Sequence, residues 1–159
     1  MTDFRIGFGY DSHRLADGLP LRLGGIDIAS ERGCVAHSDG DAAIHALCDA
    51  LLGAAALGDI GTHFPDTDPT FKGIDSTLLL QKTVGLLQQQ GWQVNNADLT
   101  IVLERPKLKD YKPLIQKKLA ELLLIADDQV SVKAKTNEGM GFLGRGEGVA
   151  VAVAVTIKR

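Results

Sequence analysis

The chain has 159 residues, 45% of them hydrophobic and 23% charged, which is typical of one globular domain with a substantial core. Its formal net charge of −3 excludes a general nucleic-acid binder, and no uncharged apolar run is long enough to cross a membrane. No signal peptide precedes the first expected strand, and Cys34 and Cys48 fit no CxxC spacing. We therefore expect a single cytoplasmic domain over residues 1–159.

The N-terminal segment pairs a carboxylate with an imidazole. A short strand is predicted over residues 4–8, and it leads directly to Asp11 and His13. If the backbone stays extended there, these two side chains point to the same side. Such an Asp-x-His pair offers one carboxylate oxygen and one imidazole nitrogen to a metal ion.

Two irregular segments follow. Residues 19–28 alternate between apolar and polar around Gly24 and Gly25, which predicts a bent hairpin with Arg22 on the solvent side. Residues 31–33 predict a turn.

An alanine-rich helix is predicted from Asp41 to Leu57, with Asp41 among the candidate N-cap residues. His45 and Asp49 lie four residues apart, so both project from one face of this helix. With Asp11 and His13, His45 completes a set of two histidines and one aspartate. That set suits a zinc site with an open fourth position, although a histidine near a helix start is often only a hydrogen-bonded surface residue.

The remaining elements alternate between helices and strands. A loop bounded by prolines is expected over residues 64–71, either as a lid or as an inert connection. Helices are predicted over 75–90 and 113–125, and strands over 94–103, 129–135 and 149–157.

The last strand is apolar on both faces, which is typical of a central strand covered on both sides. We expect an α+β fold with helices layered on one face of a four- or five-stranded mixed sheet. In so small a chain, burial of the other face requires a further subunit.

Three segments are candidates for binding an anionic substrate. They are residues 105–109, residues 133–138 and the glycine-rich stretch 141–148, and each carries lysine or arginine. Glu138 beside these cations could hold Mg²⁺ between phosphates. For the glycines, a simple tight turn between strands is the competing interpretation.

Several blocks of the sequence resemble the 2-C-methyl-D-erythritol 2,4-cyclodiphosphate synthase family. The blocks are AHSDGD at 36–41, LLGAAALGDIG at 51–61, FPDTD at 64–68 and GRGEG at 144–148. They occur in the right order and extend the resemblance over essentially the whole chain, from Asp11 to the terminal strand.

The resemblance implies a homotrimer with active sites at the subunit interfaces. Zn²⁺ or another divalent cation is bound by Asp11, His13 and His45, and Glu138 holds Mg²⁺ or Mn²⁺. The implied catalytic residues are Lys135, Thr136 and Glu138. The expected substrate-contacting residues on the metal side are Asp11, His13, His37, Ser38, Asp49, Asp59, Gly61, Phe64, Pro65, Asp66, Thr67 and Asp68. The cytidine diphosphate pocket of a neighbouring subunit is implied at Pro106, Lys107, Leu108 and Ala134, and Phe142 and Arg145 are placed at a central cavity that takes isoprenoid diphosphates.

Two features depart from the family pattern. The family often has threonine at the positions of Lys135 and Asn137, and an added lysine could tighten nucleotide binding. Glu104 receives no role from the resemblance.

The implied reaction is an intramolecular phosphoryl transfer in the non-mevalonate isoprenoid pathway. The 2-phosphate of 4-diphosphocytidyl-2-C-methyl-D-erythritol 2-phosphate attacks the β-phosphorus, and CMP leaves. The substrate carries its own nucleophile, which agrees with the absence of an obvious Ser–His or Cys–His pair. The alternatives are a metal-dependent phosphohydrolase and a non-catalytic isoprenoid-diphosphate-binding protein.

Overall fold

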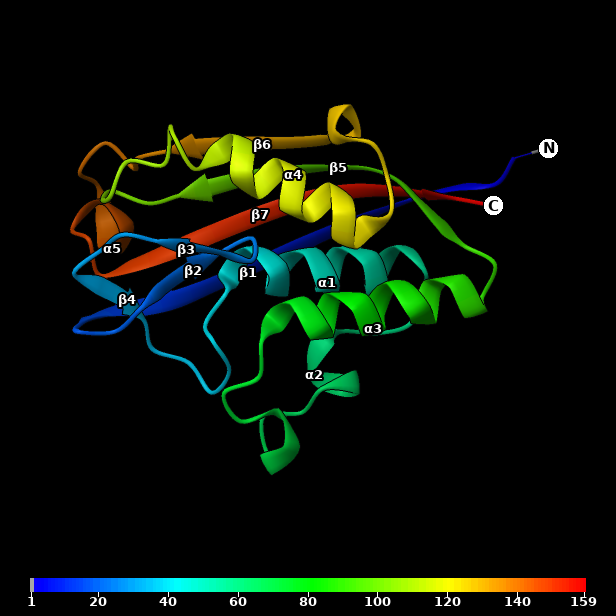
Figure 1. Ribbon diagram of the computed structural model, residues 1–159, viewed down its shortest axis with the longest axis horizontal. Coiled ribbons are helices and arrows are strands. Elements are labelled where there is room, and N and C mark those ends of the chain that lie inside the picture. Colours follow the sequence, from blue (N-terminus) through cyan, green and yellow to red (C-terminus); the bar gives the residue numbers. More distant parts are fainter. Residues whose placement is uncertain (1) are drawn as a thin grey trace.

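A five-stranded mixed sheet in the order β4-β1-β7-β5-β6 organises the computed structural model, which describes residues 2–159 (Figure 1). The four neighbouring pairs are antiparallel except β5 and β6, which run parallel. The strands of this sheet are β1 (Phe4–Asp17), β4 (Arg32–Cys34), β5 (Gln93–Val102), β6 (Val130–Lys135) and β7 (Gly148–Lys158). The predicted α+β class and the central place of the last strand are confirmed.

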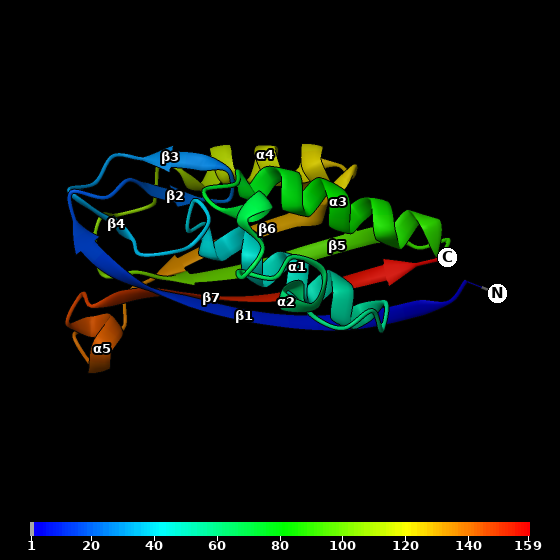
Figure 2. The ribbon, with the colours of Figure 1, turned by 90° about the horizontal axis from the view of Figure 1, so that it is seen from below.

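Helices cover one face of this sheet, as predicted. They are α1 (Ala42–Ala54), α3 (Ser76–Gln89) and α4 (Lys112–Leu123). Figure 2 shows these helices on one side and only the short α5 (Gly141–Gly144) on the other, at one end of the sheet. The uncovered face exposes Ile6, Phe8 and Tyr10, with 79%, 68% and 52% of their surface accessible. A lone chain therefore leaves a row of large apolar side chains in water.

Smaller elements complete the chain. A hairpin of β2 (Leu21–Leu23) and β3 (Ile26–Ile28) lies at the β4 end of the helical layer. The loop after α1 holds α2 (Ile60–His63) and the 3-10 turn η1 (Pro69–Phe71), and a second turn, η2 (Asp127–Gln129), precedes β6. No helix in residues 2–159 is both long and apolar enough to cross a bilayer.

The structure corrects three sequence-based expectations. The first strand does not stop near Phe8 but runs to Asp17, because all of it pairs with β7 or β4. Residues 32–34 are strand β4 rather than a turn, because they pair with the end of β1. Arg22 is only partly exposed, with 24% of its side-chain surface accessible, because its guanidinium lies 3.1 Å from Asp27 and 3.3 Å from Asp75.

Asp41 joins the β2–β3 hairpin to helix α1. Its fully buried carboxylate caps the helix by accepting from the backbone N–H of Ile44 at 3.0 Å. The same carboxylate accepts from the N–H groups of Gly24 at 2.9 Å and Gly25 at 2.7 Å. Burial raises the pKa of Asp41 to about 6, against the opposing effect of these three hydrogen bonds. The start of α1, one turn before His45, is thus fixed in place.

Helix α1 lies directly on the backbone of β1 because two glycines leave room for it. A Cβ atom on Gly7 would meet the Ala50 carbonyl oxygen at 1.8 Å, and one on Gly9 would meet that of Ala46 at 1.9 Å. Both distances are far below contact, so this spacing between helix and strand requires glycine at both positions. The close approach brings the His45 turn of the helix over Asp11 and His13.

We expect Gly9→Ala to lower the free energy of unfolding by about 3 kcal/mol, because α1 must move away from β1. Chemical denaturation of both proteins measures this difference. Gly53→Ala, in the same helix with open space around the new methyl group, is the matched control and should stabilise by about 0.5–1 kcal/mol. Equal unfolding free energies for Gly9→Ala and the wild type would contradict the packing argument.

Candidate active site

Asp11, His13 and His45 converge at the contact between β1 and α1. The Asp11 Oδ2 atom lies 3.0 Å from Nδ1 of His13 and 3.3 Å from Nδ1 of His45. One ligand atom from each residue falls within 4.8 Å of the other two. The two imidazole rings are 5.3 Å apart and tilted by 51°. The three residues predicted from spacing are therefore brought together around one point.

The bonding of these atoms fits a bound divalent cation. Asp11 Oδ2 and His13 Nδ1 are buried, yet among the described residues neither has a hydrogen-bond partner of suitable geometry. A buried polar atom without a partner is costly unless a ligand satisfies it. Two imidazoles and a carboxylate are donors that transition-metal ions prefer. The Asp11–His13–His45 group can hold such an ion.

The charges in this group stabilise one another. Burial raises the pKa of Asp11, but the close contacts with His13 and His45 and the charges of these two residues outweigh it and hold that pKa below its usual value. Burial lowers the pKa of His45, but the close contact with Asp11 and the charge of its carboxylate outweigh it and raise that pKa above its usual value. An ionised carboxylate is thus available to a cation over the whole physiological range.

A cavity of about 390 Å³ opens beside the group, and both His13 and His45 line it. Six further predicted residues contribute to its walls, which come from the chain before α1 and from the loop after it. They are His37, Ser38, Gly61, Phe64, Pro65 and Asp66. The structure also adds apolar residues that no sequence motif indicated, among them Phe71 and Leu79. The loop 60–71 is therefore a wall of this cavity.

Three predicted substrate-contacting aspartates have hydrogen-bond partners within the chain. Asp49 accepts from the backbone N–H of Ile60 at 2.7 Å and so ties the loop to α1. Asp59 caps α2 through Thr62, and Asp68 caps η1 through Thr70. None of the three lines the cavity, and neither does Thr67. These hydrogen bonds shape the loop that carries the cavity wall.

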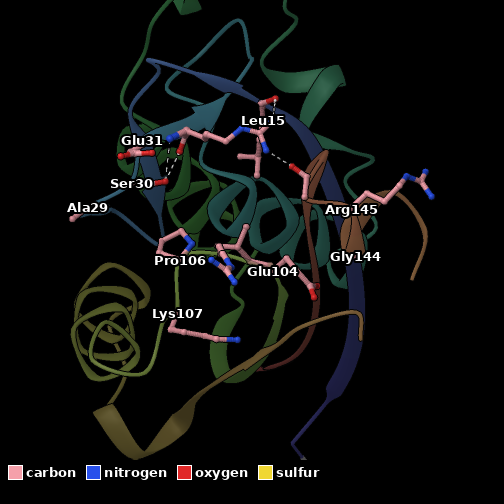
Figure 3. A pocket seen from close by; sticks show the side chains of 13 residues that line it. Leu15, Ala29, Ser30, Glu31, Glu104, Pro106, Lys107, Gly144 and Arg145 are labelled. Atoms are coloured by element: carbon pink, nitrogen blue, oxygen red, sulfur yellow. Dashed lines mark hydrogen bonds between the residues drawn. The ribbon is translucent and has the colours of Figure 1, made fainter. Parts of the chain in front are cut away.

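A second, larger cavity of about 960 Å³ is lined by residues 29–32, the loop after β5 and the segment 144–146 (Figure 3). Pro106, Lys107 and Glu104 form one wall, and Ser30 and Glu31 lie across from them. Of the predicted nucleotide residues, Leu108 is buried in the core. The residues that line this second cavity include Pro106, Lys107 and Arg145 but not Ala134, Lys135, Thr136 or Glu138. The predicted nucleotide residues thus do not line a single cavity within one chain.

Arg145 lies at the edge of this cavity, and its side chain points away from Pro106 and Lys107 (Figure 3). Its guanidinium contacts the Glu147 carboxylate at 2.8 and 2.9 Å. Phe142, on α5, is about half exposed. These two residues, predicted to line a central cavity, lie at the end of the face that the helices leave uncovered.

Glu104 holds the loop that follows β6. Its two carboxylate oxygens accept from the backbone N–H of Asn137 at 3.0 Å and of Gly139 at 3.2 Å. Between these residues Glu138 adopts a φ of 55°, a left-handed conformation that few residues other than glycine favour. Two backbone N–H groups of this loop are thus bound by Glu104. This contact explains a residue that the sequence left without a role.

Strand β1, which carries Asp11 and His13, is not a neighbour of strand β6, which leads into Lys135–Glu138. Register pairs Asp11 with Val151, Val151 with Ile101, and Ile101 with Ala134. Asp11 and Ala134 are thus in one row, three strand spacings apart, or about 14 Å. Lys135, Thr136 and Glu138 continue from the edge strand β6, away from α1.

The sequence matches the YgbB family over residues 4–158. A curated 2-C-methyl-D-erythritol 2,4-cyclodiphosphate synthase from Symbiobacterium thermophilum is 56% identical over 140 residues, which cover 88% of this chain and 89% of that protein. This chain belongs to the cyclodiphosphate synthase family.

Solved structures of the family agree with the fold. A 2C-methyl-D-erythritol-2,4-cyclodiphosphate synthase in a CDP-bound form is 43% identical, with a TM-score of 0.88 over 95% of this chain and 98% of that one. The bifunctional IspDF of Campylobacter jejuni is 41% identical, with a TM-score of 0.95 over 99% of this chain, which spans 43% of that longer protein. The predicted cyclodiphosphate synthase family is confirmed, and neither alternative is favoured.

We expect cation affinity to fall as the pH is lowered, because a protonated His45 has no lone pair to donate to a metal ion. The raised pKa of His45 places the onset above 6.5, with a loss of about tenfold per pH unit below that pKa. In the metal-free protein, stabilisation by charged His45 is present below 6.5 and disappears as the pH rises through the raised pKa. Zn²⁺ competition titrations and denaturation at a series of pH values measure both trends, and a pH-independent affinity would contradict the assignment.

Glu104→Ala should leave the N–H groups of Asn137 and Gly139 without their acceptor and loosen the loop that presents Glu138. We expect kcat/KM for the family's substrate to fall about tenfold or more, while cation affinity at Asp11 is unchanged. Steady-state kinetics and Zn²⁺ titration separate the two effects. Glu121→Ala, at an exposed position on α4, is the control. Wild-type kinetics for Glu104→Ala would refute this role.

Proposed function

We propose that the chain converts 4-diphosphocytidyl-2-C-methyl-D-erythritol 2-phosphate to 2-C-methyl-D-erythritol 2,4-cyclodiphosphate and CMP at a site completed by a second copy of the chain. The observation that carries the proposal is the Asp11–His13–His45 group, two members of which line a cavity next to His37 and Ser38. The family of the chain supplies the reaction. The whole chain of 159 residues acts as one domain around one sheet.

Alignment of the reacting groups is the main task of the protein in this reaction. The 2-phosphate oxygen attacks the β-phosphorus while the bond from that phosphorus to the CMP oxygen breaks, so the electron pair and charge leave with CMP. Holding attacker and leaving group in line can be equivalent to an effective concentration of about 10⁵ M or more. No protein nucleophile is required.

The residues divide this work between two places. His37, Ser38 and the loop 60–66 surround the methylerythritol part in the smaller cavity. Asp11, His13 and His45 would hold Zn²⁺, whose charge, when bound, neutralises phosphate oxygens. Beside the diphosphate, Lys135 and Thr136 supply a cation and a hydroxyl, and the exposed Glu138 would hold Mg²⁺ or Mn²⁺.

A homotrimer accounts for two features of the single chain. The face that α1, α3 and α4 leave uncovered exposes Ile6, Phe8 and Tyr10, which favours burial against other subunits. The 14 Å between the rows of Asp11 and Ala134 favours a site in which the nucleotide side comes from a neighbouring chain. In the trimer, Phe142 and Arg145 lie around the central axis, where an isoprenoid diphosphate is proposed to bind.

A cytoplasmic location is in keeping with two thiols, Cys34 and Cys48, that form no disulfide.

Phosphorus NMR of the protein mixed with 4-diphosphocytidyl-2-C-methyl-D-erythritol 2-phosphate, Zn²⁺ and Mg²⁺ should show CMP and a cyclic diphosphate. We expect His45→Ala to keep its fold but to lose both cation affinity and turnover. Each loss should exceed the roughly 10–100-fold that removal of an outer-sphere partner costs. Chelation with EDTA followed by re-addition of metal is the control. CMP with a linear product would identify a phosphohydrolase, and a bound but unreacted substrate would identify a binding protein.

A further inference from the structure

The second ring nitrogen of His45 has its own set of partners. While Nδ1 faces Asp11, Nε2 lies 3.0 Å from the Ser76 hydroxyl oxygen and 3.1 Å from that of Ser38. Ser76 is fully buried at the first position of α3. Neither the spacing of residues nor the family's sequence blocks pointed to Ser76.

Ser76 is in turn bound to a carboxylate. Its hydroxyl donates to Oδ1 of Asp39, and its backbone N–H donates to Oδ2 of Asp39 at 2.8 Å. The Asp39 carboxylate also accepts from the backbone N–H of Asp41 at 3.2 Å and lies 3.5 Å from Nε of Arg22. Four contacts on three segments of the chain therefore fix Asp39.

The hydrogen bonds that join Asp39, Ser76 and His45 have defined donors and acceptors. A carboxylate can only accept hydrogen bonds, so the single hydroxyl proton of Ser76 is committed to Asp39. Ser76 can then only accept from His45, a bond that forms only when an imidazole proton lies on Nε2, and the Ser38 hydroxyl oxygen can accept from the same N–H. The lone pair of His45 is left on Nδ1, the atom that faces Asp11 and the metal position.

We propose that Ser76 and Asp39 are positioning residues that select the tautomer and orientation in which His45 binds the cation through Nδ1. This inference rests on the proposed metal site and deepens it. Metal-bound histidines commonly donate their other N–H to an oxygen acceptor, and loss of such a partner costs about 10–100-fold in metal affinity. Here a serine hydroxyl transmits the effect of a carboxylate that does not itself touch the ring.

Zn²⁺ affinity of the metal-free protein, measured by competition with a chromophoric chelator, tests the relay. We expect Ser76→Ala to bind Zn²⁺ about 10–100-fold more weakly and Ser76→Thr, which keeps the hydroxyl, to restore most of the affinity. Thr83→Val removes another fully buried hydroxyl from the same helix, one that donates to the Leu79 carbonyl, and should leave affinity unchanged. Unchanged affinity in Ser76→Ala would overturn the proposal.

A double-variant cycle assigns the role of Asp39. Asp39→Asn should weaken Zn²⁺ binding when Ser76 is present and have little further effect in Ser76→Ala, because the serine carries the coupling. Additive losses would overturn the relay and leave two independent structural effects.

Nitrogen-15 NMR of histidine-labelled, Zn²⁺-loaded wild-type protein tests the tautomer without relying on the folding of any variant. We expect the His45 proton on Nε2, protected from solvent exchange. A proton on Nδ1 would overturn the proposal. Failure of the wild type to bind Zn²⁺ at all would instead contradict the metal site proposed above.

Discussion

The contact between helix α1 and strand β1 is the constraint on which the site depends. Gly7 and Gly9 let the helix backbone lie against the strand, and this contact places His45 over Asp11 and His13. A helix held farther away by a Cβ atom would separate the third ligand from the other two. Asp41 fixes the same helix along its axis by binding Gly24, Gly25 and Ile44. The arrangement of Asp11, His13 and His45 thus depends on the backbone packing of α1 against β1.

Carboxylates outside the metal group do much of the positioning. Asp49 ties the cavity loop to α1, Asp39 holds Ser76, and Glu104 holds the turn that carries Glu138. Each of these carboxylates accepts from backbone N–H groups, which are strong, fixed donors. The acidic residues that are abundant around residues 36–68 therefore act mainly on the protein's own backbone.

Strand periodicity and helix-capping preferences predicted those features that depend on residues close together in the sequence. The period of two placed Asp11 and His13 on one side of a strand, and the capping preference of aspartate and serine put Asp41 among the candidates for the start of α1. They failed where partners are distant in sequence. The sequence did not indicate that Arg22 pairs with Asp75, which is 53 residues away. It also did not indicate that Glu104 binds Asn137, because that residue too is distant along the chain. The pairing of residues 32–34 with the end of β1 was likewise invisible, because a strand of three residues has no period to detect. The contact between Ser76 and His45 could not be predicted from the sequence, because no residue close to Ser76 in the sequence indicates it.

The central claim is that one active site takes its metal side from one subunit and its diphosphate side from another. Co-assembly of two inactive variants, His45→Ala and Glu138→Ala, tests it most directly. In randomly mixed trimers about one quarter of the interfaces would combine two intact sides, so roughly a quarter of wild-type activity should return. Activity no higher than that of the separate variants, with mixed trimers present, would place both sides in a single chain and contradict the account.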